Sequence, residues 1–289
     1  MAWLVVILFF SLLTGQFGGI AVVPGVTIYI NDTVVVCILL YGLTTGALKR
    51  SLSGHRLVGP IIAFGAIAGI SLLANSSSVP LTDFLKGSLY LVRWLAYAGV
   101  YLTLVGSKRP IRWILPILFV SGFLLGLTGL LQFFLYPDLR NLSYLGYDPH
   151  FYRVFSTLLD PNFTGMVLVL TLISGVFLFN QSKQKLWISA GVVVTMATLL
   201  LTYSRSSYLA LVGSIMTWVV LQKKAVTGLI LVLLFLVAIV YIPRSGHEAL
   251  SLDRFDSTVS RFSNWSESIQ RISKKPVLGF GFNILPFIP

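Results

Sequence analysis

The feature that most constrains this chain is a succession of apolar runs, each about as long as a bilayer crossing. A helix needs roughly 20 apolar residues to cross the hydrocarbon core, with a usual range of about 17–25. Nine candidate segments meet or approach this length: 2–21, 31–48, 57–74, 84–105, 113–136, 161–180, 186–203, 206–221 and 225–242. The pattern predicts an all-α integral membrane protein with about nine transmembrane helices.

The composition excludes several classes of protein. Only 10% of the 289 residues are charged, whereas average globular domains carry about 25%. A soluble enzyme, a nucleic-acid binder and a disordered chain are therefore excluded. The single Cys37 excludes an internal disulfide framework and a cysteine-based metal cluster.

The first apolar run has no Lys or Arg before it and no clear small-residue cleavage site after it, so we expect a retained helix rather than a signal peptide.

The distribution of charge predicts the topology. Four short linkers, 49–56, 106–112, 181–185 and 222–224, contain ten Lys and Arg residues and no carboxylate. The positive-inside rule places these alternate linkers, and with them the N-terminus, in the cytoplasm. We therefore expect a membrane bundle over 1–242, an outer loop over 137–160 within it, and the start of a large extracytoplasmic loop over 243–289.

An amphipathic helix is expected inside the last of these segments. Phe262, Trp265, Ile269 and Ile272 recur at helical spacing, with polar residues on the other faces, up to Pro276. The pattern predicts about four helical turns. A helix of this kind lies against the outer membrane surface or across the mouth of the bundle.

Arg205 is the sharpest functional candidate. It lies in a short polar break between two apolar runs, on the predicted outer side, where positive-inside bias disfavours arginine. One interpretation is an anchor whose head reaches the outer lipid headgroups. The other is a guanidinium that binds a phosphate or carboxylate through two parallel hydrogen bonds. Ser204 and Ser206 beside it supply hydroxyl donors.

Arg153 precedes a second outer segment of interest, the triplet Asp160-Pro161-Asn162. Proline favours the first helical turn and an aspartate before it can cap the helix, so structure alone would explain the triplet. Arg153 is expected to face the same outer cavity as Arg205.

The remaining chemistry is sparse. Arg261 opens the amphipathic helix, and Gly279 and Gly281 follow Pro276 in a short glycine pattern typical of an ordinary turn. None of the histidines pairs with a second one at ligand spacing, and no known metal motif occurs, so no metal and no cofactor are predicted.

Four motifs in order are similar to the O-antigen ligase/polymerase superfamily, bacterial membrane glycosyltransferases that use undecaprenyl-diphosphate-linked glycans. They are R-x-x-S-T-x-x-D-P-N (Arg153 to Asn162), T-x-S-R-S (Thr202 to Ser206), S-R-F-x-x-W (Ser260 to Trp265) and P-V-L-G-F-G-F-N (Pro276 to Asn283). No single motif is specific, but their order and predicted sidedness fit the family over the whole chain.

The resemblance implies a metal-independent glycosyltransferase of GT-C-like fold in the bacterial inner membrane, active on the extracytoplasmic face. It implies that Arg205 and Arg261 are catalytic and hold the diphosphate of the donor. Substrate binding is expected at Arg153, Ser204, Asp160, Asn162, Gly279 and Gly281. The acceptor would be a lipid or a glycan, as in lipopolysaccharide assembly or polymerisation of another cell-envelope polysaccharide. Membrane lipids are the other expected partners.

The chain departs from the family in one respect. Family members have more spans, and a histidine late in the large outer loop is the proposed base, whereas this sequence ends at Pro289. We therefore expect an N-terminal fragment of a longer frame, which would supply that histidine and at least two further spans. Two alternative functions stay open. One is a secondary transporter for an anion such as inorganic carbon, and the other is an inactive scaffold of a polysaccharide assembly complex.

Overall fold

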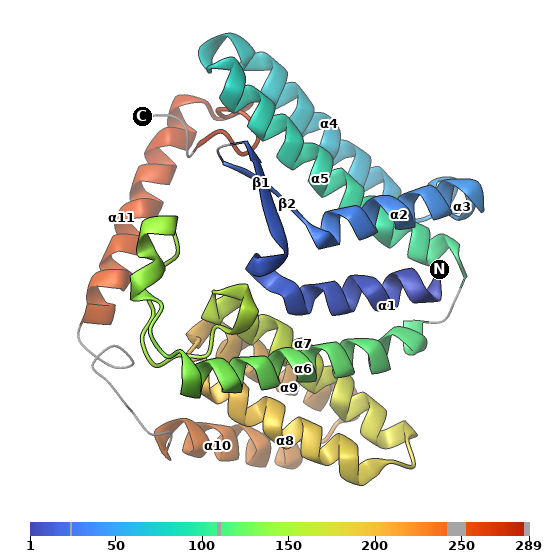
Figure 1. Ribbon diagram of the computed structural model, residues 1–289, viewed down its shortest axis with the longest axis vertical. Helices are drawn as coiled ribbons and strands as arrows, with labels where there is room; N and C mark the ends of the chain where they lie inside the picture. Colours follow the sequence, from blue (N-terminus) through green and yellow to red (C-terminus); the bar gives the residue numbers. More distant parts are fainter. Residues whose placement is uncertain (24, 109–110, 242–252, 286–289) are drawn as a thin grey trace. The chain divides into compact units, whose positions relative to one another are not determined.

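The computed structural model describes residues 1–23, 25–108, 111–241 and 253–285, and these are mainly helical (Figure 1). The chain divides into two compact units. The first unit comprises Met1–Leu8, Gly19–Pro110 and Phe255–Pro289, and the second comprises Phe9–Gly18 and Ile111–Arg254. Each unit is described by itself.

Eight of the nine predicted apolar runs are helical over most of their length, with bounds close to those predicted. In the first unit they are α2 (Ile30–Thr44), which the short α3 (Ala47–Leu52) follows, α4 (Val58–Ala74) and α5 (Leu81–Gly106). In the second unit they are α6 (Ile114–Leu135), α7 (Pro161–Gln181), α8 (Lys185–Leu201), α9 (Arg205–Gln222) and α10 (Ala225–Tyr241).

The structure corrects the prediction of one continuous helix over the ninth run, 2–21. Helix α1 covers only Ala2–Ser11, and a 3₁₀ segment, η1 (Leu12–Gly18), follows it. Strands β1 (Gly19–Val23) and β2 (Val26–Tyr29) then form an antiparallel hairpin in which Gly19 pairs with Tyr29. Gly15 adopts a positive φ of 49°, which a continuing helix does not allow, and the β-branched residues that follow favour a strand. The hairpin shortens the first predicted helix, while the described chain as a whole is mainly helical, as the sequence predicts.

Three described helices, α5, α6 and α7, are long and apolar enough to cross a membrane. Residues 2–18 and helices α2, α4, α8 and α10 are apolar but shorter. The structure therefore confirms a mainly helical chain with membrane-spanning candidates. The number of nine spans and the GT-C-like arrangement stay predictions.

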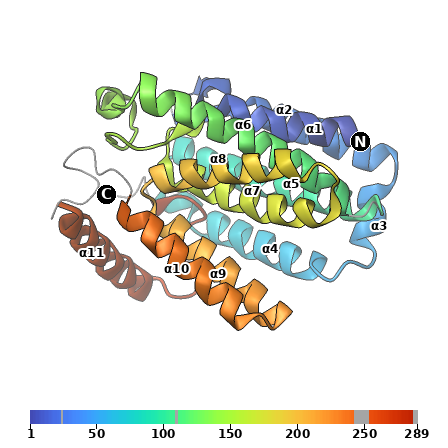
Figure 2. The same cartoon turned by 90° about the horizontal axis from the view of Figure 1, so that it is seen from below.

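Helix α7 is central to the packing of the second unit. It contacts α6, α8 and α9 (Figure 2). It also contributes Leu168, Val169 and Leu172 to the buried core. Small residues allow these close approaches, as is usual between membrane helices. Gly122 of α6, for example, lies against the side chain of Thr171. The hydroxyl of Thr171 donates to the carbonyl of Val167 one turn back, which satisfies a polar group in an apolar setting.

In the first unit, two of the basic linkers meet at one end of the helices. The Nε of Arg50, in α3, donates to the carbonyl of Gly106 at the end of α5 over 3.1 Å. The opposite end of α4 receives the C-terminal segment, where Ile284 packs against Ala68, Leu72 and Leu91.

The amphipathic helix is α11 (Asp253–Lys274), a longer helix than the four turns predicted. Its apolar residues Phe262, Trp265, Ile269 and Ile272 are all exposed. Its expected place at the membrane surface stays a prediction.

Candidate functional site

The start of α7 has the structure that the Asp160-Pro161-Asn162 triplet predicts. Asp160 is the N-cap residue, and its Oδ1 accepts hydrogen bonds from the backbone N–H of Asn162 at 2.6 Å and of Phe163 at 3.0 Å. Pro161 occupies the first helical turn, where its missing N–H costs nothing. One carboxylate oxygen of Asp160 is therefore engaged in capping.

The start of α9 lies beside the start of α7, and hydrogen bonds between polar side chains join these two helix starts. Ser204 is the N-cap residue of α9, and its Oγ donates to Oδ1 of Asn162 over 2.9 Å. The Oγ of Ser207 donates to the backbone carbonyl of Asn162 over 3.3 Å. A Cβ on Gly165 would clash with the Oγ and Cβ of Ser207, so the close approach of the two helices depends on this glycine.

Arg153 has a different environment from the one expected. Its side chain is buried, with Nε donating to the carbonyl of Thr202 over 2.9 Å and Nη2 to the carbonyl of Tyr203 over 3.4 Å. Its Nη1 lies 3.4 Å from Nδ1 of His150. The guanidinium of Arg153 thus holds the turn between α8 and α9, rather than lying in an open cavity beside Arg205.

The backbone around this turn is strained. Ser156, Leu159 and Tyr203 all have positive φ, at 52°, 55° and 49°, although none is a glycine. Residues in this region persist only where surrounding contacts fix them.

Gln132 is a positioning residue that the sequence interpretation missed. From near the end of α6, its Oε1 accepts from the backbone N–H of Phe155 at 2.9 Å and of Ser156 at 3.2 Å. Its Nε2 donates to the carbonyl of Arg153 over 3.2 Å. The sequence does carry a signal for this role: Gln132 is a lone amide side chain inside an apolar run, and a polar group at that depth requires hydrogen-bond partners.

Arg205 is the first residue of α9, and its side chain is exposed. Within the described parts of the chain it forms no ion pair. The first N–H groups of a helix point outward and carry partial positive charge, and here two helix starts adjoin. An exposed guanidinium at the start of a helix, as Arg205 is at the start of α9, is an arrangement that favours an anion.

The other predicted site residues belong to the first unit. Arg261 lies within α11, but its side chain is outside the described residues. Gly279 and Gly281 have φ of +60° and +104°, so both occupy positions in a turn that favour glycine. The expected convergence of Arg261 with Arg205 stays a prediction.

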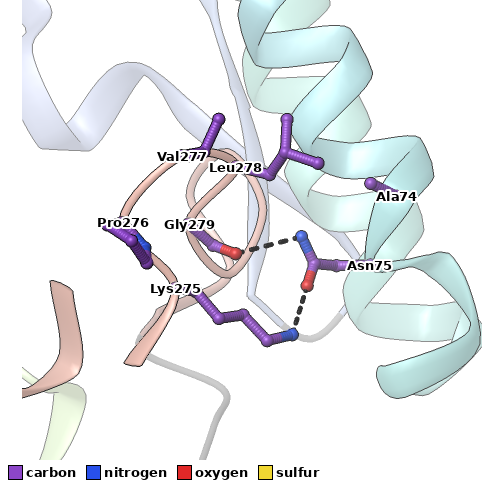
Figure 3. Close-up of a pocket in the computed structure, with 7 residues that line it drawn as sticks. All are labelled: Ala74, Asn75, Lys275, Pro276, Val277, Leu278 and Gly279. Atoms are coloured by element: carbon purple, nitrogen blue, oxygen red, sulfur yellow. Dashed lines mark hydrogen bonds between the residues drawn. The ribbon is translucent and has the colours of Figure 1, made fainter. Parts of the chain in front are cut away.

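A pocket of about 300 Å³ lies between the end of α4 and this glycine turn (Figure 3). Asn75 is buried at its wall, where its Nδ2 donates to the carbonyl of Gly279 over 3.2 Å. The Nζ of Lys275 donates to Oδ1 of Asn75 over 2.6 Å. The rest of the lining is mainly apolar: Ala74, Pro276, Val277 and Leu278. These hydrogen bonds fix the turn against α4.

No group of three or more His, Cys, Asp or Glu side chains that could hold a metal ion occurs within the described ranges. The absence of a metal and of a cofactor stays a prediction for the whole chain.

Comparison with known proteins identifies one family. Residues 190–288 match the sequence model of the family described as O-antigen ligase. The match covers about one third of the chain, including Arg205, helix α11 and the glycine turn. No curated protein and no solved structure matches. The family match confirms the resemblance of this chain to the O-antigen ligase/polymerase superfamily.

Proposed function

We propose that this protein transfers a glycan from an undecaprenyl-diphosphate donor to an acceptor hydroxyl on the extracytoplasmic face of the bacterial inner membrane. The family match supports membership of a membrane glycan ligase or polymerase family, whose donors are lipid-linked. The acceptor is a lipid or a glycan, and the reaction needs neither a metal nor a cofactor.

The observation that carries the proposal is the position of Arg205. Its exposed guanidinium begins α9, and hydrogen bonds from Ser204 and Ser207 to Asn162 fix the start of α9 against that of α7. A diphosphate leaving group gains charge as its bond to the sugar breaks. Fixed positive groups at that place lower the energy of the transition state. A guanidinium suits this task because its planar fork matches two phosphate oxygens.

The transfer itself is a substitution at the anomeric carbon. The acceptor oxygen forms a new bond to that carbon, and the carbon–oxygen bond to the diphosphate breaks, with its electron pair leaving on the diphosphate oxygen. The acceptor hydroxyl loses its proton to a base, to which we assign no described residue. Arg205 neutralises the leaving diphosphate, and Arg261 is proposed to assist.

The other candidate residues are proposed to hold this geometry. Arg153 fixes the turn before Arg205 through the carbonyls of Thr202 and Tyr203. Ser204 and Asn162 join the two helix starts, and Asp160 caps α7. Contact of these groups with substrate, and of Gly279 and Gly281 with it, is part of the proposal rather than an observed contact.

The test replaces Arg205 by alanine in the protein expressed in its own cells. Loss of one donor to a developing oxyanion costs about 10²- to 10³-fold in rate, so Arg205→Ala should abolish ligated or polymerised glycan. Arg56→Ala is the matched control, since Arg56 is also exposed but lies in a predicted cytoplasmic linker. Normal glycan product from Arg205→Ala, with equal protein in the membrane, would overturn the assignment.

Anion transport is the alternative that uses the same guanidinium. It predicts uptake of an anion such as bicarbonate into proteoliposomes that depends on Arg205, together with normal glycan in the Arg205→Ala cells. The proposed transfer predicts the reverse of both results.

A further inference from the structure

Helix α5 carries a line of polar side chains that the proposed reaction does not use. Asp83, Lys86, Tyr90, Arg93 and Tyr97 follow one another at intervals of three and four residues, which places them on one face of the helix. We call this set the α5 stripe. It extends over about 21 Å, since a helix rises 1.5 Å per residue. Helix α5 is a candidate membrane span, and polar groups in a span face protein or a water-filled space.

The centre of the stripe is an ion pair that the sequence interpretation did not foresee. Nη2 of Arg93 lies 2.7 Å from Oδ2 of Asp32, in the first turn of α2. The same nitrogen donates to the carbonyl of Thr27 in β2, and Oδ2 of Asp32 accepts from the backbone N–H of Tyr29 at 2.9 Å. The pair therefore fixes the β1–β2 hairpin and α2 against α5, elements of the same unit (Figure 1).

Together with Asp32 of α2, the stripe carries no net charge. Nζ of Lys86 pairs with Oδ1 of Asp83 over 3.0 Å, and Arg93 pairs with Asp32. Two positive and two negative groups thus neutralise each other. The charge at the start of α9 is not balanced in this way, because Arg205 has no carboxylate partner among the described residues.

Hydrogen-bonding capacity remains at the centre of the stripe. Within the described chain, Nε and Nη1 of Arg93 have no hydrogen-bond acceptor, because its contacts use Nη2 alone. The rings of Tyr29 and Tyr90 lie 5.8 and 5.7 Å from the guanidinium carbon. The Arg93 side chain is 29% exposed. A polar group left without a partner is costly in an apolar setting, so these N–H groups require water or a ligand.

We propose that the α5 stripe binds the sugar units of a neutral glycan chain. Sugars present many hydroxyls and patches of C–H on their ring faces, which match hydrogen-bond donors and acceptors interleaved with tyrosine rings. The charge balance selects against phosphate, because Asp32 next to Arg93 repels an anion. The inference rests on the proposed function for its substrate class: the stripe would hold glycan, while Arg205 holds the diphosphate.

The experiment measures binding of glycan directly, without the transfer reaction. The whole protein, purified in nanodiscs, is applied to a printed array of bacterial polysaccharides, and binding of inorganic pyrophosphate is measured separately. Tyr90→Ala removes one ring and leaves both ion pairs intact, while Arg93→Gln removes the guanidinium and with it the Nε and Nη1 donors and the pair with Asp32. Tyr101→Ala is the matched control, since Tyr101 lies one turn beyond Tyr97 on α5 and contacts His55 instead.

We expect the wild type to bind at least one neutral polysaccharide, and Tyr90→Ala and Arg93→Gln each to weaken that binding about tenfold. Tyr101→Ala should leave it unchanged. The proposal is overturned if no polysaccharide binds, if Tyr90→Ala binds like the wild type, or if Arg93→Gln affects only pyrophosphate. Loss of glycan transfer in Arg205→Ala tests the proposed function separately, so either idea can fail alone.

Discussion

The start of α9 and the middle of α5 satisfy their polar groups in opposite ways. At the start of α9, backbone carbonyls and amides take up the polar side chains: Arg153 donates to two carbonyls and Asp160 accepts from two amides. Arg205 has no ion-pair partner among the described residues. In the middle of α5, Arg93 and Asp32 neutralise each other. The first arrangement leaves a net positive charge that suits an anion, and the second leaves a neutral, aromatic surface.

The comparison also separates two arginines of the same region. Arg153 is buried with its donors directed at the carbonyls of Thr202 and Tyr203, whereas Arg205 is exposed. The sequence interpretation placed both in the same outer cavity. The structure instead favours a positioning role for Arg153 and a binding role for Arg205, and variants can distinguish these roles.

Replacing Arg153 by alanine should have the largest effect on stability. The change leaves two buried carbonyls without their donor, and an unsatisfied buried group costs about 1–3 kcal/mol, so we expect a loss of about 3 kcal/mol. Thermal unfolding in detergent measures it. Arg153→Lys should recover part of the loss. Unchanged unfolding of Arg153→Ala, with lost substrate affinity, would show that Arg153 binds substrate directly.

Gly165→Ala should break the junction between α7 and α9. The new Cβ would clash with the Oγ of Ser207, and overpacking of this kind costs about 1–3 kcal/mol. Gly213→Ala is the control within α9, because its Cβ would enter open space and alanine favours a helix. Unfolding temperatures should fall for the first and stay level or rise for the second. Equal temperatures for both variants would contradict the close junction.

Arg205→Lys tests whether the fork of the guanidinium matters. Lysine keeps the positive charge but offers a point charge in place of two parallel donors. We expect glycan transfer to fall about tenfold, which corresponds to roughly 1.4 kcal/mol, without a change in thermal stability. The rate of transfer to acceptor in membranes is the measurement. Full activity of Arg205→Lys would mean that charge alone suffices at this position.

Hydropathy and linker charge predicted most helices, because each apolar run is bounded by polar or helix-breaking residues. The helix start at Asp160-Pro161 followed from capping chemistry that is local in sequence. The hairpin over β1 and β2 was missed because Ile20, Ala21 and Val22 are as apolar as a span. Hydropathy does not distinguish the two, and only the flanking glycines signalled the break.

The roles within the candidate site were harder to predict, because they depend on contacts between distant residues. Arg153 reaches carbonyls about 50 positions along the chain, and Asp32 pairs with Arg93 over a similar separation. Spacing along one helix predicts neighbours on that helix alone. The family motifs pointed to the turn before Arg205, but they did not show that Arg153 would be buried beneath it.

Asp160→Ala is expected to have the smallest effect, and it separates capping from catalysis. Removing an N-cap acceptor costs about 1 kcal/mol, because the backbone N–H groups of Asn162 and Phe163 lose their partner. Asp160→Asn keeps an oxygen that can cap the helix but removes the negative charge. If Asp160 only caps α7, Asp160→Asn should retain both thermal stability and glycan transfer, while Asp160→Ala loses a little stability. Transfer that fails in Asp160→Asn with unfolding unchanged would instead assign the carboxylate to the reaction, next to the guanidinium of Arg205.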